Sequence, residues 1–341
     1  MAHYPLLTKH SSFYLARERI GEDEEFIFQG QNSPPLRNIN TAQLLNEQRE
    51  RRGENVAVVS EWQNSSTLQY ESLIHSVRDI ARSLLGLGVR HGDRIVVLAG
   101  NSIEYVQLFL AIGSIGAIFA IINSSFTVEE VEVAVDFLGH GKLIMWPVGS
   151  AQSYGDLLTW TSFRLSGLNV KENLIDRYWG QVDPNDALCI QFTSGTTGPR
   201  RASMLAHRNL LNNADLLGHR LNMSSEDVLC CSLPLSHCFG LVCGVLATIT
   251  HGGTVIIPSD VFNPNASLRA ISEHQCTVIH AVPTIFQALM DFAAAQSYTK
   301  RLKLRTGIIA GSSLSETLLR RLQAELGLDG LAYAFGNKEF P

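Results

Sequence analysis

The sequence predicts an α/β protein in which helices cover largely parallel sheets. Short apolar runs alternate with amphipathic segments along most of the chain, and this βαβ rhythm is typical of a parallel sheet wrapped by helices. The rhythm appears in the first half of the chain and again in the second. Of the 341 residues, 45% are hydrophobic and 17% are charged, which indicates a well-buried globular protein and excludes a disordered one.

The first half is expected to alternate helix and strand from residue 41 onward. Apolar residues recur near helical spacing over residues 70–87, and Thr127 with Glu130 fits a capping box at a helix start. The expected helices are 41–52, 70–87, 102–112 and 127–138. The expected strands are 56–61, 94–99, 116–122 and 142–146.

The most apolar run, residues 108–122, is shorter than a helix needs to cross a bilayer. Glycines interrupt it, so it is interpreted as a buried helix that leads into a buried parallel strand. The sequence therefore predicts no transmembrane segment. A glycine-rich stretch at 86–92 loosely resembles a dinucleotide fingerprint, but it lies between a helix and a strand in the wrong order. This order argues against a nicotinamide-dependent dehydrogenase.

The second half repeats the pattern after a polar, turn-rich connection at 147–186. The expected strands are 187–192, 227–232, 254–258, 278–281 and 306–310. The expected helices are 206–211, 268–274 and 284–295. Three regions are predicted: a polar, loosely attached lead-in at 1–40, a first α/β subdomain at 41–215, and a second at 216–341.

Composition narrows the function classes. A net charge of −5 gives no support for a nucleic-acid surface. The six cysteines form no Cys-x-x-Cys pair, so they are interpreted as reduced core residues of an intracellular protein without a zinc site. No secretory signal is visible; the cytoplasm is favoured, with mitochondrion and peroxisome left open. Cys238 beside His237 suggests a thiol nucleophile, but neighbouring side chains in an extended segment point apart, which disfavours that interpretation.

The segment 193–201, Thr-Ser-Gly-Thr-Thr-Gly-Pro-Arg-Arg, is the most informative in the chain. It follows a predicted strand and precedes a predicted helix, so it lies where open α/β sheets bind ligands. Its glycines allow close backbone approach, successive N–H groups form an anion site, and hydroxyls and arginines add donors and charge. An ordinary surface loop is the alternative, and the segment is not a Walker A loop, because no Gly-Lys-Ser/Thr ends it.

Residues 193–209 resemble the phosphate-loop signature of the AMP-forming adenylate-forming enzymes, which include acyl-CoA synthetases, luciferases and peptide-synthetase adenylation domains. Further segments agree with this family in order. They are Leu-Gln-Tyr-Glu-Ser-Leu at 68–73, Gly-Val-Arg-His-Gly-Asp-Arg at 88–94, Asn101-Ser102, Leu-Pro-Leu-Ser-His-Cys-Phe-Gly at 233–240, Val282-Pro283-Thr284 and Ala-Gly-Ser-Ser at 310–313. The resemblance runs from about Leu68 to the last residue and is closest to the medium-chain acyl-CoA synthetases.

This resemblance implies the large N-terminal domain of an adenylate-forming enzyme. It implies two parallel-sheet subdomains with flanking helices, truncated before a barrel subdomain and a C-terminal domain. The implied reaction is attack of a carboxylate on the α-phosphorus of ATP with Mg²⁺, followed by displacement of AMP by a thiol, usually that of CoA. The implied cofactors and substrates are therefore ATP, Mg²⁺, CoA and a small carboxylic acid.

The resemblance also assigns roles to residues. The catalytic residues are His237 and Arg201. The resemblance implies that the ATP phosphates are bound by Thr193, Ser194, Gly195, Thr196, Thr197 and Gly198. It implies that adenine is bound by Gly311, Ser312, Ser313 and Phe335. The acyl pocket is placed at Phe239, Gly240 and Gly244, and the Mg²⁺ ligand at Glu339.

Several positions depart from the family pattern. Arg201 stands where the family has lysine, Phe335 where it has tyrosine, and Lys338 where it has threonine. The family's ribose-binding aspartate and C-terminal lysine have no counterpart in the 341 residues. Three functions are therefore weighed: an ATP-dependent acyl-CoA ligase, a non-catalytic nucleotide-binding remnant, and a unit that loads an acyl carrier protein. The last is disfavoured because no carrier module is attached.

Overall fold

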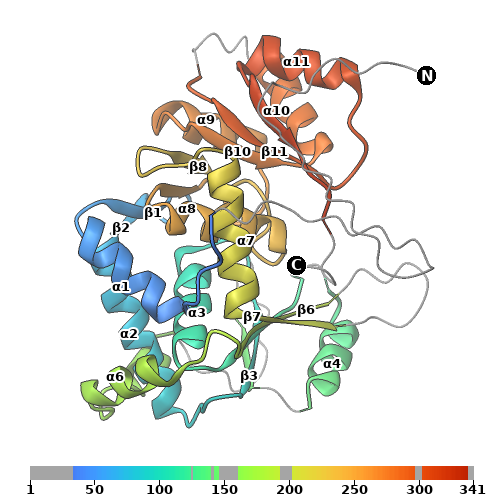
Figure 1. Ribbon diagram of the computed structural model, residues 1–341. Coiled ribbons are helices and arrows are strands. Elements are labelled where there is room, and N and C mark those ends of the chain that lie inside the picture. The colour runs from blue at the N-terminus through green and yellow to red at the C-terminus, as the bar shows by residue number, and fades with distance from the viewer. Residues whose placement is uncertain are drawn as a thin grey trace, which may run out of the picture. The chain divides into compact units, whose positions relative to one another are not determined.

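The computed structural model describes residues 34–123, 126–139, 142–145, 160–192, 202–295 and 302–336. The chain divides into two compact units, Met1–Arg37 and Asn38–Pro341. The first is described only from residue 34, where the chain forms neither helix nor strand. All described helices and strands belong to the second unit (Figure 1). The predicted lead-in therefore lies almost entirely outside the described residues.

The smaller of the two sheets has five strands in the order β5-β3-β4-β6-β7. Its first four strands pair in parallel, and β6 and β7 pair antiparallel. The strands are β3 (Arg94–Leu98), β4 (Ile118–Ile121), β5 (Lys142–Met145), β6 (Ala187–Phe192) and β7 (Ala202–Ala206). The prediction of a mainly parallel sheet is confirmed, whereas β7 was not expected.

The larger sheet has seven strands in the order β12-β11-β10-β8-β9-β1-β2, parallel except for the β1–β2 hairpin. The strands are β1 (Val56–Ser60), β2 (Ser66–Gln69), β8 (Val228–Cys230), β9 (Thr254–Ile257), β10 (Val278–Ala281), β11 (Thr306–Ile309) and β12 (Gly330–Tyr333). Strand β1 pairs with β9, with Val58 opposite Val255. The division into subdomains at residue 215 stays a prediction. The larger sheet contains strands from both sides of this residue, because β1 and β2 precede it and β8–β12 follow it.

Helices surround both sheets (Figure 1). They are α1 (Thr41–Arg52), α2 (Tyr70–Gly86), α3 (Ile103–Ser114), α4 (Val128–Phe137), α5 (Trp160–Leu165), α6 (Glu172–Gln181), α7 (His207–Arg220), α8 (Ala247–Thr250), α9 (Pro264–Glu273), α10 (Pro283–Ala295) and α11 (Glu316–Leu326). The predicted capping box is confirmed, because Thr127 accepts from the Glu130 N–H and Glu130 accepts from the Thr127 N–H. Helix α3 and strand β4 are almost wholly buried, as expected of the apolar run 108–122. Among the described helices, none combines the length and the apolar character that a membrane span requires.

Helices α5 and α6 lie where the sequence predicted only a connection. Helix α6 buries Ile175 and Trp179, and the guanidinium of Arg78 on α2 lies 4.9 Å from the centre of the Trp179 ring. Arg78 also donates to Glu172 and Asp176 on α6, at 2.8 and 2.7 Å. The helix is amphipathic but short, so its stability comes from this packing rather than from its own sequence.

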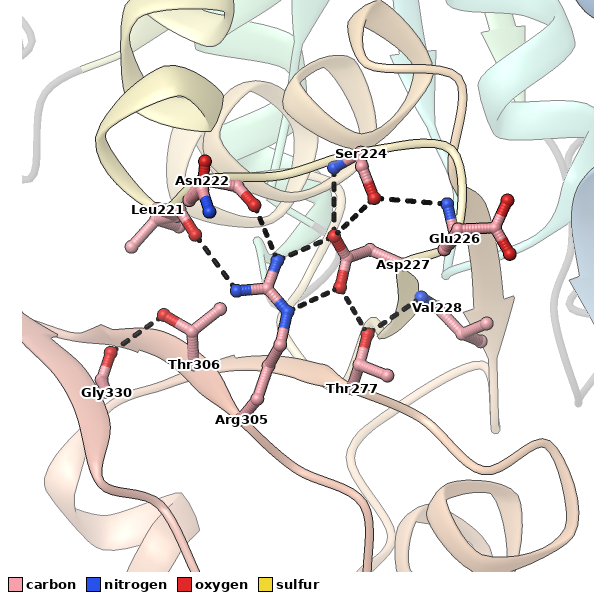
Figure 2. Close-up of polar contacts among 10 residues, drawn as sticks. All are labelled: Leu221, Asn222, Ser224, Glu226, Asp227, Val228, Thr277, Arg305, Thr306 and Gly330. Atoms are coloured by element: carbon pink, nitrogen blue, oxygen red, sulfur yellow. Dashed lines mark hydrogen bonds and ion pairs between the residues drawn. The ribbon is translucent and has the colours of Figure 1, made fainter.

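A network of polar contacts joins α7 to three strands at the edge of the larger sheet where the strands begin (Figure 2). The Asp227 carboxylate, with its side chain 4% exposed, receives two hydrogen bonds from the Arg305 guanidinium, at 2.8 and 2.6 Å. Thr277 donates to the same carboxylate at 2.7 Å. Arg305 also donates to the carbonyl oxygens of Leu221 and Asn222, which follow α7. One buried carboxylate thus fixes the entries to β8, β10 and β11.

Candidate functional site

The predicted site residues of the larger sheet gather at the edge where its parallel strands end. The segment with His237 follows β8, Gly311–Ser313 follow β11, and Phe335 follows β12. Because these strands are parallel neighbours, their carboxyl ends meet at one edge (Figure 1). Open α/β sheets bind ligands at this edge.

Asn101 joins the carboxyl ends of the two sheets. It follows β3 of the smaller sheet, and its side chain is buried. Its amide nitrogen donates to Leu233 O at 2.9 Å, and its amide oxygen accepts from Leu235 N at 2.8 Å. Its backbone N–H donates to Asp260 O, beyond β9, at 2.9 Å. Asn101 therefore links the carboxyl edges of the two sheets.

The flanks of segment 193–201 lie on the smaller sheet. Phe192 at the end of β6 and Ala202 at the start of β7 are paired neighbours. Strand β6 is two strands from β3, which at the usual strand spacing is about 10 Å. The segment thus leaves and re-enters the sheet at the edge that Asn101 ties to the His237 segment. The predicted phosphate-binding residues Thr193–Gly198, together with Arg201 and the predicted Mg²⁺ ligand Glu339, lie outside the described residues.

His237 lies in a turn and is exposed, so it is not a core histidine. Its Nδ1 accepts a hydrogen bond from Phe239 N at 3.1 Å, and its backbone N–H donates to Pro234 O at 3.2 Å. Cys238 Sγ lies 3.7 Å from the same Nδ1. The two side chains do not point apart as predicted, because the segment is a turn and not extended.

The predicted acyl-pocket residues lie on a π-helix, η1 (Phe239–Leu246). Such helices are rare and often occur at functional sites. Gly240 is packed so tightly that a Cβ atom there would overlap the carbonyl oxygen of Pro234. Gly244 is looser, since the nearest atom to a Cβ there would be a Leu229 methyl at 3.5 Å. Burial raises the pKa of the nearby Cys243 thiol to about 12, so that thiol is protonated and unsuited to nucleophilic attack.

His280 on β10 is a site-building residue that the sequence did not single out. Its ring stacks on Phe239, with centroids 6.1 Å apart and planes 10° apart, and its Nδ1 accepts from Ile308 N at 3.1 Å. Burial lowers the pKa of His280 to about 4, and backbone groups of Cys243 and Ile279 only partly oppose this. The imidazole is therefore neutral near pH 7. Its position at a strand end beside Ala281-Val282-Pro283 was the available signal.

The predicted adenine-binding residues lie just after the last two strands of the described chain. Gly311 has a φ of +90°, which favours glycine, and Ser312 and Ser313 are exposed. The Tyr333 hydroxyl donates to Ser312 O at 3.4 Å. Phe335 is 94% exposed, and it comes two residues after Tyr333. The structure brings these segments to adjacent strand ends, while their contact with adenine stays a prediction.

Residues 45–337 match the family described as AMP-binding enzyme. The chain belongs to this family. It is 36% identical to the acyl-CoA ligase SID4 of Ajellomyces capsulatus over 94% of this chain and 59% of that protein. It is 29% identical to the mitochondrial medium-chain acyl-CoA ligase ACSF2 of Rattus norvegicus over 80% of this chain and 51% of that protein. The chain thus spans between about half and three fifths of these relatives.

The fold agrees with the solved N-terminal domain of FACL13 from Mycobacterium tuberculosis. The TM-score is 0.72 at 19% identity, with 88% of this chain and 76% of that chain covered. At this identity the likeness shows the fold alone. The prediction that the chain belongs to the AMP-binding family, with acyl-CoA ligases among its relatives, is confirmed.

Replacing Asn101 tests the link between the two sheets. We expect Asn101→Ala to lower the free energy of unfolding by about 1–3 kcal/mol, because it leaves a buried N–H and a buried carbonyl without their partner. Chemical denaturation measures this. Asn185→Ala is the matched control, since Asn185 is exposed and its side chain bonds only within its own turn; it should change stability by less than about 0.5 kcal/mol. Equal losses in the two variants would contradict the structural role of Asn101.

Proposed function

We propose that this chain supplies the ATP- and carboxylate-binding part of an acyl-CoA ligase. The observation that carries the proposal is the convergence of two carboxyl edges at Asn101. Segment 193–201 leaves one edge and the His237 segment leaves the other. A nucleotide that extends from Gly311 toward β6 would place its phosphates between them. The names of the relatives, all acyl-CoA ligases, support the same reaction class.

In the proposed reaction, a carboxylate oxygen attacks the α-phosphorus of ATP and pyrophosphate leaves. The thiol of CoA then attacks the acyl carbon and AMP leaves. No protein nucleophile is required, so catalysis rests on positioning and on neutralising charge. The backbone and hydroxyls of Thr193–Gly198 would hold the β- and γ-phosphates, and Arg201 would hold the charge of the leaving pyrophosphate.

The remaining roles follow from position. His237 would line the meeting point of the carboxylate and the α-phosphate, and the hydrogen bond from Phe239 N to its Nδ1 would orient the ring. Gly311–Ser313 and Phe335 would contact adenine. The acyl chain would lie along Phe239, Gly240 and Gly244, with neutral His280 behind Phe239. This apolar lining suits a medium-length hydrocarbon chain.

Mg²⁺ prefers carboxylate and other oxygen ligands. Glu339 offers a carboxylate of the right chemistry, and the bound ion would neutralise phosphate charge. We place the protein inside the cell, where ATP and CoA are found, in keeping with six cysteines that form no disulfide.

Hydroxyl removal in segment 193–201 tests the nucleotide site. We expect the double variant Thr196→Ala and Thr197→Ala to weaken ATP binding at least about tenfold, since hydrogen bonds to charged groups contribute about 1.5–3 kcal/mol each. Calorimetry with ATP and Mg²⁺ measures this. Thr67→Ala, an exposed threonine on edge strand β2, is the control and should bind ATP as the unaltered protein does.

The product identifies the reaction. Incubation with ATP, Mg²⁺ and octanoate should yield octanoyl-adenylate, detectable by mass spectrometry, and His237→Ala should lower its yield. ATP binding without any adenylate across a series of carboxylic acids would favour the nucleotide-binding remnant instead. Transfer to a carrier protein in preference to CoA would favour the carrier-loading alternative.

A further inference from the structure

Two histidines and a buried aspartate meet at the C-terminal end of α7, away from the candidate nucleotide site. Asp215 and His219 are one helical turn apart, so they share a face of α7. His251 directly follows α8 and precedes β9. The donor atoms of the three side chains all lie within 4.8 Å of one another. We propose that Asp215, His219 and His251 bind a divalent cation of the Zn²⁺ type.

The separations suit a shared ion better than direct hydrogen bonds. His219 Nε2 lies 3.8 Å from one Asp215 carboxylate oxygen, and His251 Nε2 lies 3.8 Å from the other. Both are longer than a hydrogen bond. Tetrahedral zinc with bonds of about 2.0–2.1 Å holds its ligands about 3.3 Å apart. Movements of about 1 Å or less, easily made by the half-exposed His219 ring, would complete the coordination.

The chain is built to bring His251 against α7. A Cβ atom at Gly218 would overlap Cδ2 and Nε2 of the His251 ring, so the glycine makes room for the imidazole. The rings of His219 and His251 meet edge to face, with centroids 5.0 Å apart. Gly218 thus lets the His251 ring approach the face of α7 that carries Asp215 and His219.

Burial gives the carboxylate a reason to hold a cation. The side chains of Asp215 and His251 are 10% and 11% exposed, so an ion between them would be largely shielded from water, where its attraction to the carboxylate is stronger. The competing arrangement is visible too, since His251 Nε2 lies 3.1 Å from Asp215 O and can donate to it. Zinc would bind the Nε2 lone pair of the other neutral tautomer, in which the ring proton is carried by Nδ1 instead of Nε2.

The ligand set selects the metal. Two imidazoles and one carboxylate suit Zn²⁺ and neighbouring transition metals, whereas Mg²⁺ prefers oxygen ligands alone. The site lies at the amino end of β9, on the opposite edge of the sheet from His237. Its role is therefore structural: the ion would join α7 to the connection between α8 and β9, and binding to the folded state alone raises stability.

Calorimetric titration of ZnCl₂ into the chelator-treated, desalted 341-residue chain tests the proposal, with excess Mg²⁺ present to saturate oxygen-only sites. The expected result is one zinc ion per chain at this site, and at least about tenfold weaker binding for His219→Ala and for His251→Gln, since even the loss of a residue that only orients a ligand costs about 10–100-fold. His75→Ala is the matched control, because His75 and Glu71 form a similar pair one turn apart on α2. It should leave zinc affinity unchanged.

Two further measurements separate the proposal from misfolding and from binding elsewhere. In the presence of chelator, His219→Ala and the unaltered protein should have the same melting temperature. When Zn²⁺ is added, the melting temperature of the unaltered protein alone should rise. Co²⁺ in place of Zn²⁺ should give visible bands of four-coordinate nitrogen and oxygen ligation, without thiolate charge-transfer absorption. The proposal is overturned if His219→Ala binds zinc as tightly as the unaltered chain, if His75→Ala loses as much affinity, or if the Co²⁺ spectrum shows cysteine ligation.

Discussion

Asp227→Ala is expected to lower the free energy of unfolding by about 2–3 kcal/mol, because it removes the buried acceptor that the Arg305 guanidinium and the Thr277 hydroxyl share. Arg305 donates two hydrogen bonds to this carboxylate and Thr277 a third (Figure 2). Without it, the carbonyl oxygens of Leu221 and Asn222 are the remaining acceptors for Arg305. The entries to β8, β10 and β11 lose their common anchor together. Urea denaturation followed by circular dichroism measures the loss.

The matched control is Asp291→Ala. Asp291 also faces an arginine, Arg321, at 3.6 Å, but its side chain is 60% exposed. Exposed pairs contribute about 0–1 kcal/mol, so this variant should be nearly as stable as the unaltered protein. A similar small loss for both aspartates would show that the network in Figure 2 does not stabilise the fold.

The same carboxylate predicts a pH dependence. Burial acts to raise the pKa of Asp227, but hydrogen bonds from Arg305 and Thr277 outweigh it and the net pKa is lowered. A group with a lowered pKa in the folded state stabilises it above its unfolded pKa of about 3.9, and this contribution is lost as the pH falls toward the folded value. The stability difference between the unaltered protein and Asp227→Asn should therefore be constant near neutrality and narrow below about pH 4.

Gly240→Ala is expected to destabilise the protein by about 3 kcal/mol and to abolish productive acyl binding. The added Cβ would overlap Pro234 O, and the clash is with backbone, which cannot rotate away. Relief requires the start of η1 to move, and with it Phe239, which stacks on His280. Chemical denaturation measures the loss in the free energy of unfolding, and the yield of octanoyl-adenylate measures the loss of acyl binding.

Gly244→Ala, on the same π-helix, isolates the cause. A Cβ there meets its nearest neighbour at 3.5 Å, an ordinary van der Waals contact, so the change in stability should stay below about 1 kcal/mol. If the segment binds the acyl chain, the extra methyl should disfavour longer carboxylic acids over shorter ones. If both substitutions destabilise the protein equally, the overlap with Pro234 O is not the cause of the loss in Gly240→Ala.

Local pattern was enough to predict most strands and long helices. Apolar runs such as Val278–Ala281 and Ala187–Phe192 match the observed strands at both ends, because a strand buried on both faces needs continuous hydrophobic residues. The short strand Ala202–Ala206 was missed because its five residues show no alternation of apolar and polar side chains, and it is defined by pairing with β6. No local signal distinguishes a π-helix from an α-helix, so η1 was not foreseen.

Motifs located the site segments, but not what holds them together. His237 and Gly311 were found from short motifs, whereas the role of Asn101 depends on hydrogen bonds to Leu233 and Leu235, more than a hundred positions away. The stacking of His280 on Phe239 likewise requires two segments to meet in space. The alternation of helix and strand also could not reveal that β1 joins the larger sheet. Strand β1 pairs there with β9, about 200 residues later in the chain, and such pairing depends on how the whole core packs.

That long-range pairing has a consequence during synthesis on the ribosome. The β1–β2 hairpin closes locally, but Ser60 of β1 must wait for its partner Ile257 of β9, which emerges about 200 residues later. At about 5–20 residues per second, the apolar β1 edge stays uncovered for roughly 10–40 seconds. An unpaired edge of this kind is prone to association with other nascent chains. Chaperone protection of the early chain is therefore expected to govern how much protein reaches the native state.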